Sequence, residues 1–170
     1  MQTKIFLTVI TFCFFGAALA QNFDKPTVKS KNQTYNVKKM ENTVFLNNEK
    51  KEFTGKKPNY RLDTLKLSGL SWKEAQIEVT KKVKDYLVNQ RNISLETLPN
   101  VFTQWYILKN GQIKEVTFMF PRDTPLTAQD FEEMEKIITQ TKIEVTQPQF
   151  YQSVNFIPIH IPFIWKQTVR

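Results

Sequence analysis

The sequence predicts an α+β fold: a small three-stranded antiparallel sheet of strand order 2-1-3, two helices packed on one face, and an extended N-terminal arm with one or two short strands. Three observations predict it. Two apolar runs flank Asn110-Gly111, two other segments repeat apolar residues at helical spacing, and a last apolar run closes the chain. The length of 170 residues suits one domain.

Residues 1–20 have the features of a secretory signal peptide. Lys4 precedes an apolar core, and Ala18-Leu19-Ala20 forms a small-residue cleavage signal. Cleavage near Ala20-Gln21 makes the mature protein periplasmic or secreted, with no transmembrane span. It also removes Cys13, the only cysteine, so the mature chain forms no disulfide.

Lysine pairs dominate the charge, which is +8 for the whole chain and falls to +7 once Lys4 is removed. A solvated surface is the favoured interpretation, and a peripheral contact with an anionic lipid or polysaccharide is the alternative. The candidate polyanion contacts are Lys38, Lys39, Lys50, Lys51, Lys56 and Lys57. Nucleic acid is not expected, because arginines and aromatics do not gather near these pairs and secretion argues against it.

Residues 21–70 are polar and rich in Lys and Asn, which predicts the N-terminal arm. Short apolar groups at Tyr35/Val37 and at residues 44–46 mark its one or two strands. The folded domain then occupies residues 71–170.

The first helix is expected to begin at Ser71, where Glu74 completes a capping box, and to fade near Arg91. The second is expected to follow Pro125, with Thr127 as N-cap and Asp130 three residues later. Each helix carries one apolar stripe that faces the sheet.

Residues 101–108 and 112–120 form the predicted hairpin. Asn110-Gly111 between apolar runs is a strong hairpin signal, because both residues tolerate the positive φ of a tight turn. Val116 and Ile113 have opposite parity, which predicts a bulge near Lys114-Glu115.

The last strand is the stretch FIPIHIPFIW, residues 156–165, which is too short and too rich in proline for a membrane helix. Pro158 and Pro162 share parity, so both missing N–H donors fall on one edge. We expect an edge strand whose outer side these prolines protect from pairing.

No catalytic, cofactor or metal motif is present. His160 is the only histidine and has no cysteine beside it, and the chain contains neither a phosphate-binding glycine loop nor a nucleophile elbow. The sequence therefore predicts a protein that is not an enzyme, although carboxylates brought together by folding leave no local trace.

The stretches WYILKNGQIKEVTFMF, TAQDFEEMEKIITQ and VNFIPIHIPFIW resemble the C-terminal domain of TonB-type energy transducers, and more loosely that of TolA, over residues 72–165. The resemblance implies a domain that grips a peptide of an envelope protein by strand addition. The family also has an uncleaved membrane helix and a Pro-rich linker, which this sequence lacks, so it does not predict energy transduction.

Three functions follow as hypotheses. The first is a non-enzymatic secreted or periplasmic module that binds a protein or peptide. The alternatives are a lysine-rich module for anionic envelope glycans or lipids, and a hydrolase whose site is assembled only by folding. With strand order 2-1-3, a peptide is expected at the edge of residues 112–120 or on the uncovered sheet face.

Overall fold

The computed structural model describes residues 23–60 and 66–165. The predicted signal peptide and its cleavage site near Ala20-Gln21 lie outside these described residues.

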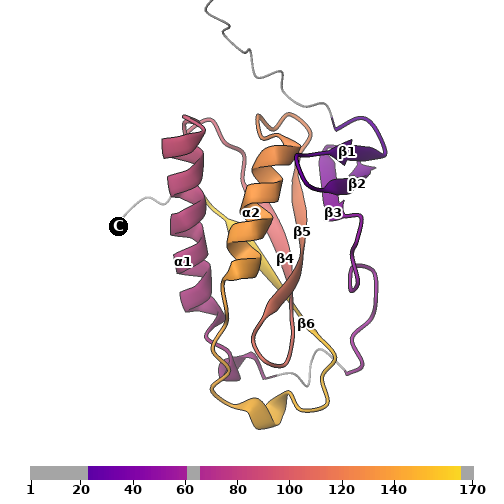
Figure 1. Ribbon diagram of the computed structural model, residues 1–170, viewed down its shortest axis with the longest axis vertical. Helices are drawn as coiled ribbons and strands as arrows, with labels where there is room; N and C mark the ends of the chain where they lie inside the picture. The colour runs from indigo at the N-terminus through magenta and orange to yellow at the C-terminus, as the bar shows by residue number, and fades with distance from the viewer. Residues whose placement is uncertain (1–22, 61–65, 166–170) are drawn as a thin grey trace, which may run out of the picture.

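Six antiparallel strands form one sheet in the order β1-β2-β3-β5-β4-β6, with the two helices in front of it in Figure 1. The strands are β1 (Thr27–Lys29), β2 (Thr34–Met40), β3 (Thr43–Asn48), β4 (Val101–Ile107), β5 (Ile113–Pro121) and β6 (Ile157–Phe163). The chain is α+β, but the prediction of a three-stranded sheet is wrong.

The three additional strands come from the predicted N-terminal arm. β3 pairs with β5 from Thr43–Pro121 to Asn47–Thr117, and it buries Val44 on the helix side of the sheet. An unpaired β5 would have left a row of free backbone N–H and C=O groups at the edge, and β3 satisfies them. The edge of residues 112–120 is therefore not free to take a peptide, which corrects that expectation.

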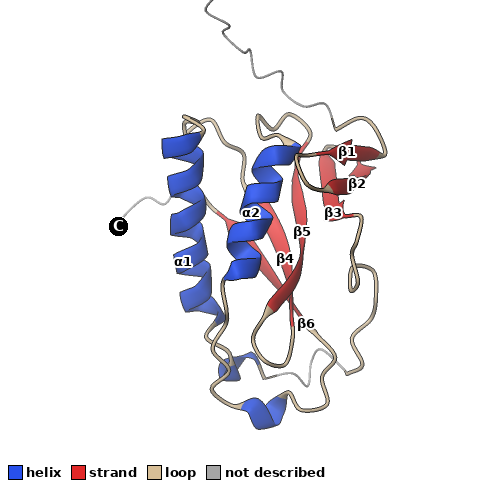
Figure 2. Cartoon of the chain, viewed as in Figure 1, coloured by secondary structure: helices blue, strands red, loops and turns tan. Residues whose placement is uncertain are grey.

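Two α-helices lie on the same face of the sheet (Figure 2). They are α1 (Trp72–Asp85), which continues into the π-helical turn η3 (Tyr86–Gln90), and α2 (Ala128–Gln140). Two short 3-10 turns, η2 (Leu67–Gly69) and η4 (Pro148–Phe150), lie in the connecting segments.

The two predicted capping boxes have different outcomes. At α2 the Thr127 side chain accepts from the Asp130 N–H and the Asp130 carboxylate accepts from the Thr127 N–H, as predicted. Ser71 is the N-cap of α1, but its side chain makes no capping hydrogen bond. Its N–H donates to the carbonyl oxygen of Glu144 at 3.0 Å, and its ψ of 48° lies outside the extended region that a capping serine usually adopts.

The hairpin and its bulge are confirmed. Gly111 has a φ of +83° in the turn between β4 and β5. Tyr106 pairs with Glu115 and Ile107 pairs with Ile113, so Lys114 is the extra residue of the bulge. This bulge restores the apolar alternation of β5.

The core lies between the sheet and the helices. The Phe131 ring of α2 stacks on Phe120 with centroids 4.3 Å apart and tilts against Phe118 at 5.0 Å. Phe118 and Phe120 therefore face the helices, and the alternate residues Thr117 and Met119 face away from them.

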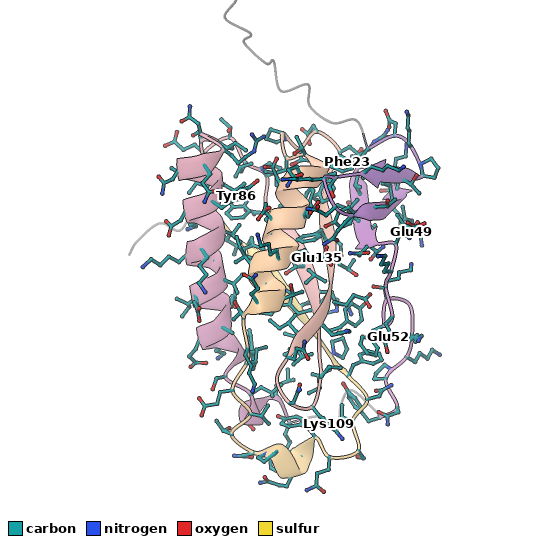
Figure 3. The ribbon with its side chains drawn as sticks, in the orientation of Figure 1. Phe23, Glu49, Glu52, Tyr86, Lys109 and Glu135 are labelled. Atoms are coloured by element: carbon teal, nitrogen blue, oxygen red, sulfur yellow. The ribbon has the colours of Figure 1, made fainter. Side chains whose placement is uncertain are left out.

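Two carboxylates of α2 fasten the N-terminal strands to the helix layer. Glu132 accepts hydrogen bonds from the Ser30 hydroxyl and from the backbone N–H and side-chain amide of Asn32, in the turn between β1 and β2. Glu135, which Figure 3 labels on α2, accepts from the Tyr35 hydroxyl of β2. Burial raises the pKa of Glu135, and the hydrogen bonds from Tyr35 and Asn48 offset part of that shift.

Candidate functional site

The sheet face turned away from the helices is the candidate site, and a row of polar side chains crosses it. Asn36 pairs with Asn47, Asn47 with Thr117, Thr117 with Gln104, and Gln104 with His160. Five strands thus place these side chains side by side on one face. They come from segments far apart in the sequence, so only the strand register brings them together.

A second row runs beside the first and is mainly apolar. Lys38 pairs with Phe45, Phe45 with Met119, Met119 with Phe102, and Phe102 with Pro162. Phe102 is 51% exposed near the start of β4, a strand that pairs on both sides with β5 and β6. A large exposed aromatic on a paired strand is a common feature of interaction surfaces.

Two exposed apolar side chains lie beyond this row on the same face. Met40 follows Lys38 by two residues in β2 and is 54% exposed, and Ile164 follows Pro162 by two residues and is 44% exposed. We call Met40, Phe45, Phe102, Met119, Pro162 and Ile164 the apolar strip.

The loop after β3 covers the part of this face that lies on the far side of the polar row from the apolar strip. The buried carboxylate of Glu115 accepts hydrogen bonds from the backbone N–H groups of Glu52 and Phe53 at 2.7 Å and from that of Thr54 at 2.8 Å. Figure 3 labels Glu52 on this loop beside the sheet. The loop is therefore held on the sheet by one side chain of β5.

Aromatic packing adds to this attachment. The Phe53 ring lies 4.8 Å from the Phe156 ring and 6.4 Å from the Tyr106 ring, measured between centroids. The Tyr106 and Phe156 rings are also in contact, with centroids 5.7 Å apart. The covered end of the face is thus packed. Asn47 and Thr117 of the polar row are also buried, whereas Phe102 of the second row is exposed.

A hollow of about 360 Å³ lies between this loop and the polar row. Its amide and hydroxyl side chains are those of Asn36, Asn47, Gln104, Thr54, Tyr106 and Thr117, and its cationic side chains are Lys38 and Lys51. No carboxylate of residues 23–60 or 66–165 lines it.

The hydrogen bonds at its floor fix the direction of the Asn47 amide. The Thr117 hydroxyl donates to Asn47 Oδ1 at 2.7 Å, which leaves the Asn47 NH₂ group available as a donor. Thr117 Oγ1 also lies 3.1 Å from the Thr54 hydroxyl, whose hydrogen is donated to Glu115. The Asn47 and Thr117 oxygen atoms at the floor are therefore already in hydrogen bonds within the protein, and the Asn47 NH₂ group remains to donate to a ligand.

The structure brings together two of the six lysines predicted as polyanion contacts. Lys38 and Lys51 line the hollow, whereas Lys39 alternates to the other face and forms a 3.0 Å ion pair with Asp24. The remaining three, Lys50, Lys56 and Lys57, are exposed and do not line it.

Pro158 and Pro162 lie on β6, a terminal strand of the sheet, and both are partly exposed. Since a proline cannot donate, the pairing of β6 with β4 uses the N–H groups of the other parity. The Pro162 carbonyl points away from β4, because it accepts a 3.3 Å hydrogen bond from the Gln76 side chain of α1.

The fold brings two carboxylates of α2 together, and both are engaged by other parts of the chain. The Glu132 and Glu135 carboxylates accept hydrogen bonds from the N-terminal strands. Across residues 23–60 and 66–165, no group of three or more His, Cys, Asp or Glu side chains is placed to hold a metal ion. In the same residues, no helix has the length and apolar character needed to cross a membrane.

Sequence reasoning missed most of this site. It singled out the lysines, but not the amides, the Phe102 side chain or the role of Glu115. One signal was available, because Glu115 lies inside a predicted strand directly before the apolar-alternating Val116, Phe118 and Phe120, where a charged side chain that is buried needs partners.

No family model and no curated protein matches the chain. Among solved structures, the crystal structure of a DUF5043 family protein from Bacteroides uniformis is similar, with 17% sequence identity and a TM-score of 0.59. The match covers 83% of this chain and 86% of that chain. At this identity the likeness shows a shared fold alone, and the name of that protein assigns it no activity.

Proposed function

We propose that this protein is a non-enzymatic binding module of the bacterial envelope, periplasmic or secreted, which takes a protein partner on the open face of its sheet. The single observation that carries the proposal is the apolar strip around Phe102. It lies on the face opposite the helices, whereas Phe118 and Phe120 on the other face are buried under α2.

The composition of this face supports a protein partner. Aromatic residues and Met are enriched in the buried centres of protein interfaces, and Phe45, Phe102 and Met119 follow one another across three neighbouring strands. The polar row beside them supplies hydrogen-bonding groups of the kind that border such centres. Backbone that is already held in a hydrogen-bonded sheet loses little conformational entropy when it binds, which favours affinity.

The fold favours the sheet face over strand addition. β5 is internal, and of the two terminal strands β1 has three residues while β6 contains both prolines. Neither terminal strand offers a long row of free donors to a peptide. This mode of binding differs from the one that the TonB-like resemblance implies.

Site-specific photo-crosslinking in the native host tests the proposal. A photoreactive phenylalanine analogue at Phe102 should give one discrete adduct, and the same analogue at Ile77 should not. Ile77 is 72% exposed on α1, in the helix layer, and is the matched control. The captured protein, purified, should bind the wild type and bind Phe102→Ala at least about tenfold more weakly, as expected for an interface hot spot.

Equal adducts from both positions would contradict the proposal, because they would report only random collisions. An unchanged affinity of Phe102→Ala for the purified partner would also contradict it.

A further inference from the structure

We infer that the hollow beside the loop is a carboxylate-binding subsite, which takes an acidic side chain of an extended peptide segment of the partner. The inference rests on the proposed function, since it names the chemistry of the partner that the open face binds.

The charges of the hollow fit an anion. Lys38 and Lys51 approach it from β2 and from the loop, and neither forms an ion pair with any described residue. Two ammonium groups at one concave site attract a negative group and accelerate its association.

The neutral groups of the hollow fit the same ligand. The Asn47 amide has committed its oxygen to Thr117 and presents N–H donors. The side chains of Asn36 and Gln104 line the same space and have no hydrogen-bond partner among the described residues. A carboxylate has only acceptors, so it can use these donors together with both ammonium groups.

The Glu115 carboxylate lies close to the hollow, and its hydrogen bonds explain why its negative charge does not repel an anionic ligand. Glu115 is 4% exposed and accepts from three backbone N–H groups and the Thr54 hydroxyl. These donors stabilise its charge, and the loop separates it from solvent. Glu115 therefore holds in place the loop that borders the hollow, but its own side chain does not line the hollow.

The geometry of the face points to a peptide. Gln104 lines the hollow, and Phe102 lies two residues earlier in the same strand and on the same face. Two residues of a strand span about 7 Å, which is also the separation of side chains i and i+2 in an extended peptide. A peptide residue two positions from an acidic residue in the hollow thus lies over the apolar strip, and we take the second residue after it as the one to test.

The test uses two blocked tripeptides as probes, acetyl-Asp-Ser-Phe-amide and its neutral counterpart acetyl-Asn-Ser-Phe-amide. Titration of the full mature protein is followed by nuclear magnetic resonance, with the side-chain amides of Asn47 and Gln104 as reporters. We expect the Asp peptide to shift these signals and the Asn peptide to bind about tenfold more weakly, with binding of the Asp peptide weakened by added salt.

Paired lysine variants give the matched comparison. Lys38→Met with Lys51→Met should weaken binding of the Asp peptide about tenfold. Lys50→Met with Lys56→Met removes the same charge outside the hollow and should leave the affinity within about twofold. Thermal unfolding of both double variants checks that each retains the fold.

Several outcomes overturn the inference. They are equal affinity for the two peptides, equal losses in the two double variants, signal shifts confined to α1, or no shift with either peptide. Tighter binding of a trigalacturonate at the same amides would also overturn it, in favour of an acidic glycan. If the Lys38/Lys51 variant still binds the partner captured through Phe102 with full affinity, the subsite fails while the proposed function stands.

Discussion

The Tyr35 hydroxyl of β2 donates a 2.7 Å hydrogen bond to Oε2 of Glu135 on α2, and both residues are buried. This bond joins the N-terminal strands to the helix layer. Burial raises the pKa of Glu135, and it also raises the pKa of Tyr35, with the nearby Glu135 charge as the second cause. The pair therefore makes stability depend on pH in a definite direction.

Glu135→Gln should stabilise the protein increasingly as pH rises. The folded state binds the Glu135 proton more tightly than the unfolded chain, so the wild type loses stability between the unfolded pKa, about 4.3, and the raised folded pKa. The glutamine variant has no such loss, so the difference in unfolding free energy should grow through this window and then level off. Urea unfolding at a series of pH values measures it, and a difference that shrinks with rising pH would contradict the assignment.

Glu132→Gln, one helical turn away, should show the opposite dependence. Burial pushes the pKa of Glu132 upward, but the hydrogen bonds from Ser30 and Asn32 outweigh it and leave this pKa lowered. The charged form is thus stabilising above the unfolded pKa, and that contribution is lost as pH falls through the folded pKa. We expect a cost of about 1–2 kcal/mol near neutral pH that disappears in acid.

The two variants serve as controls for one another, and Glu49→Gln removes the same charge from an exposed site. Parallel profiles for Glu132→Gln and Glu135→Gln would mean that overall charge, not these local contacts, controls the pH dependence.

Local signals in the sequence predicted local structure well. Thr127 and Asp130 are three residues apart, and Asn110-Gly111 lies within its own turn, so neighbouring residues contain all the information that these features need. Ser71 shows the limit of such signals. Its backbone is bonded to Glu144, and that distant contact overrides the local capping preference.

The sheet order and the site depended on pairing between distant segments. β3 and β5 are separated by the whole of α1 and β4, and the Lys- and Asn-rich arm showed little apolar alternation to indicate that it joins the sheet. The row from Asn36 to His160 exists only because the register of five strands aligns it. A hollow made in this way leaves no motif in the sequence.

Gly111→Ala should destabilise the fold much more than Gly55→Ala. Both glycines have nearly the same positive φ, +83° and +84°, so both substitutions carry a similar backbone penalty of about 1 kcal/mol. A Cβ at Gly111 would lie 1.9 Å from the carbonyl oxygen of Ile143, whereas nothing lies within 4 Å of one at Gly55.

The excess cost at Gly111 should be at least about 2 kcal/mol, because the hairpin must move away from residue 143 and strain the 2.9 Å hydrogen bond from the Ile143 N–H to the Gly111 carbonyl. Denaturant unfolding of the two variants measures the difference. Equal losses would show that the turn and the segment after α2 are not in contact.

Replacing Pro158 and Pro162 together by Val should leave the fold intact and promote dimers or fibrils. Each substitution restores one N–H donor on the outer edge of β6, where only His160 of that parity has one. Each new edge hydrogen bond is worth about 0.5–1.5 kcal/mol, so two of them favour pairing with a second β6 by about tenfold or more. Light scattering with size-exclusion chromatography and an amyloid-dye assay measure the association.

His160→Val is the matched control, since it adds a valine to the same strand and face without a new donor. If the double variant unfolds, stays monomeric, or associates no more than His160→Val does, the prolines do not protect this edge.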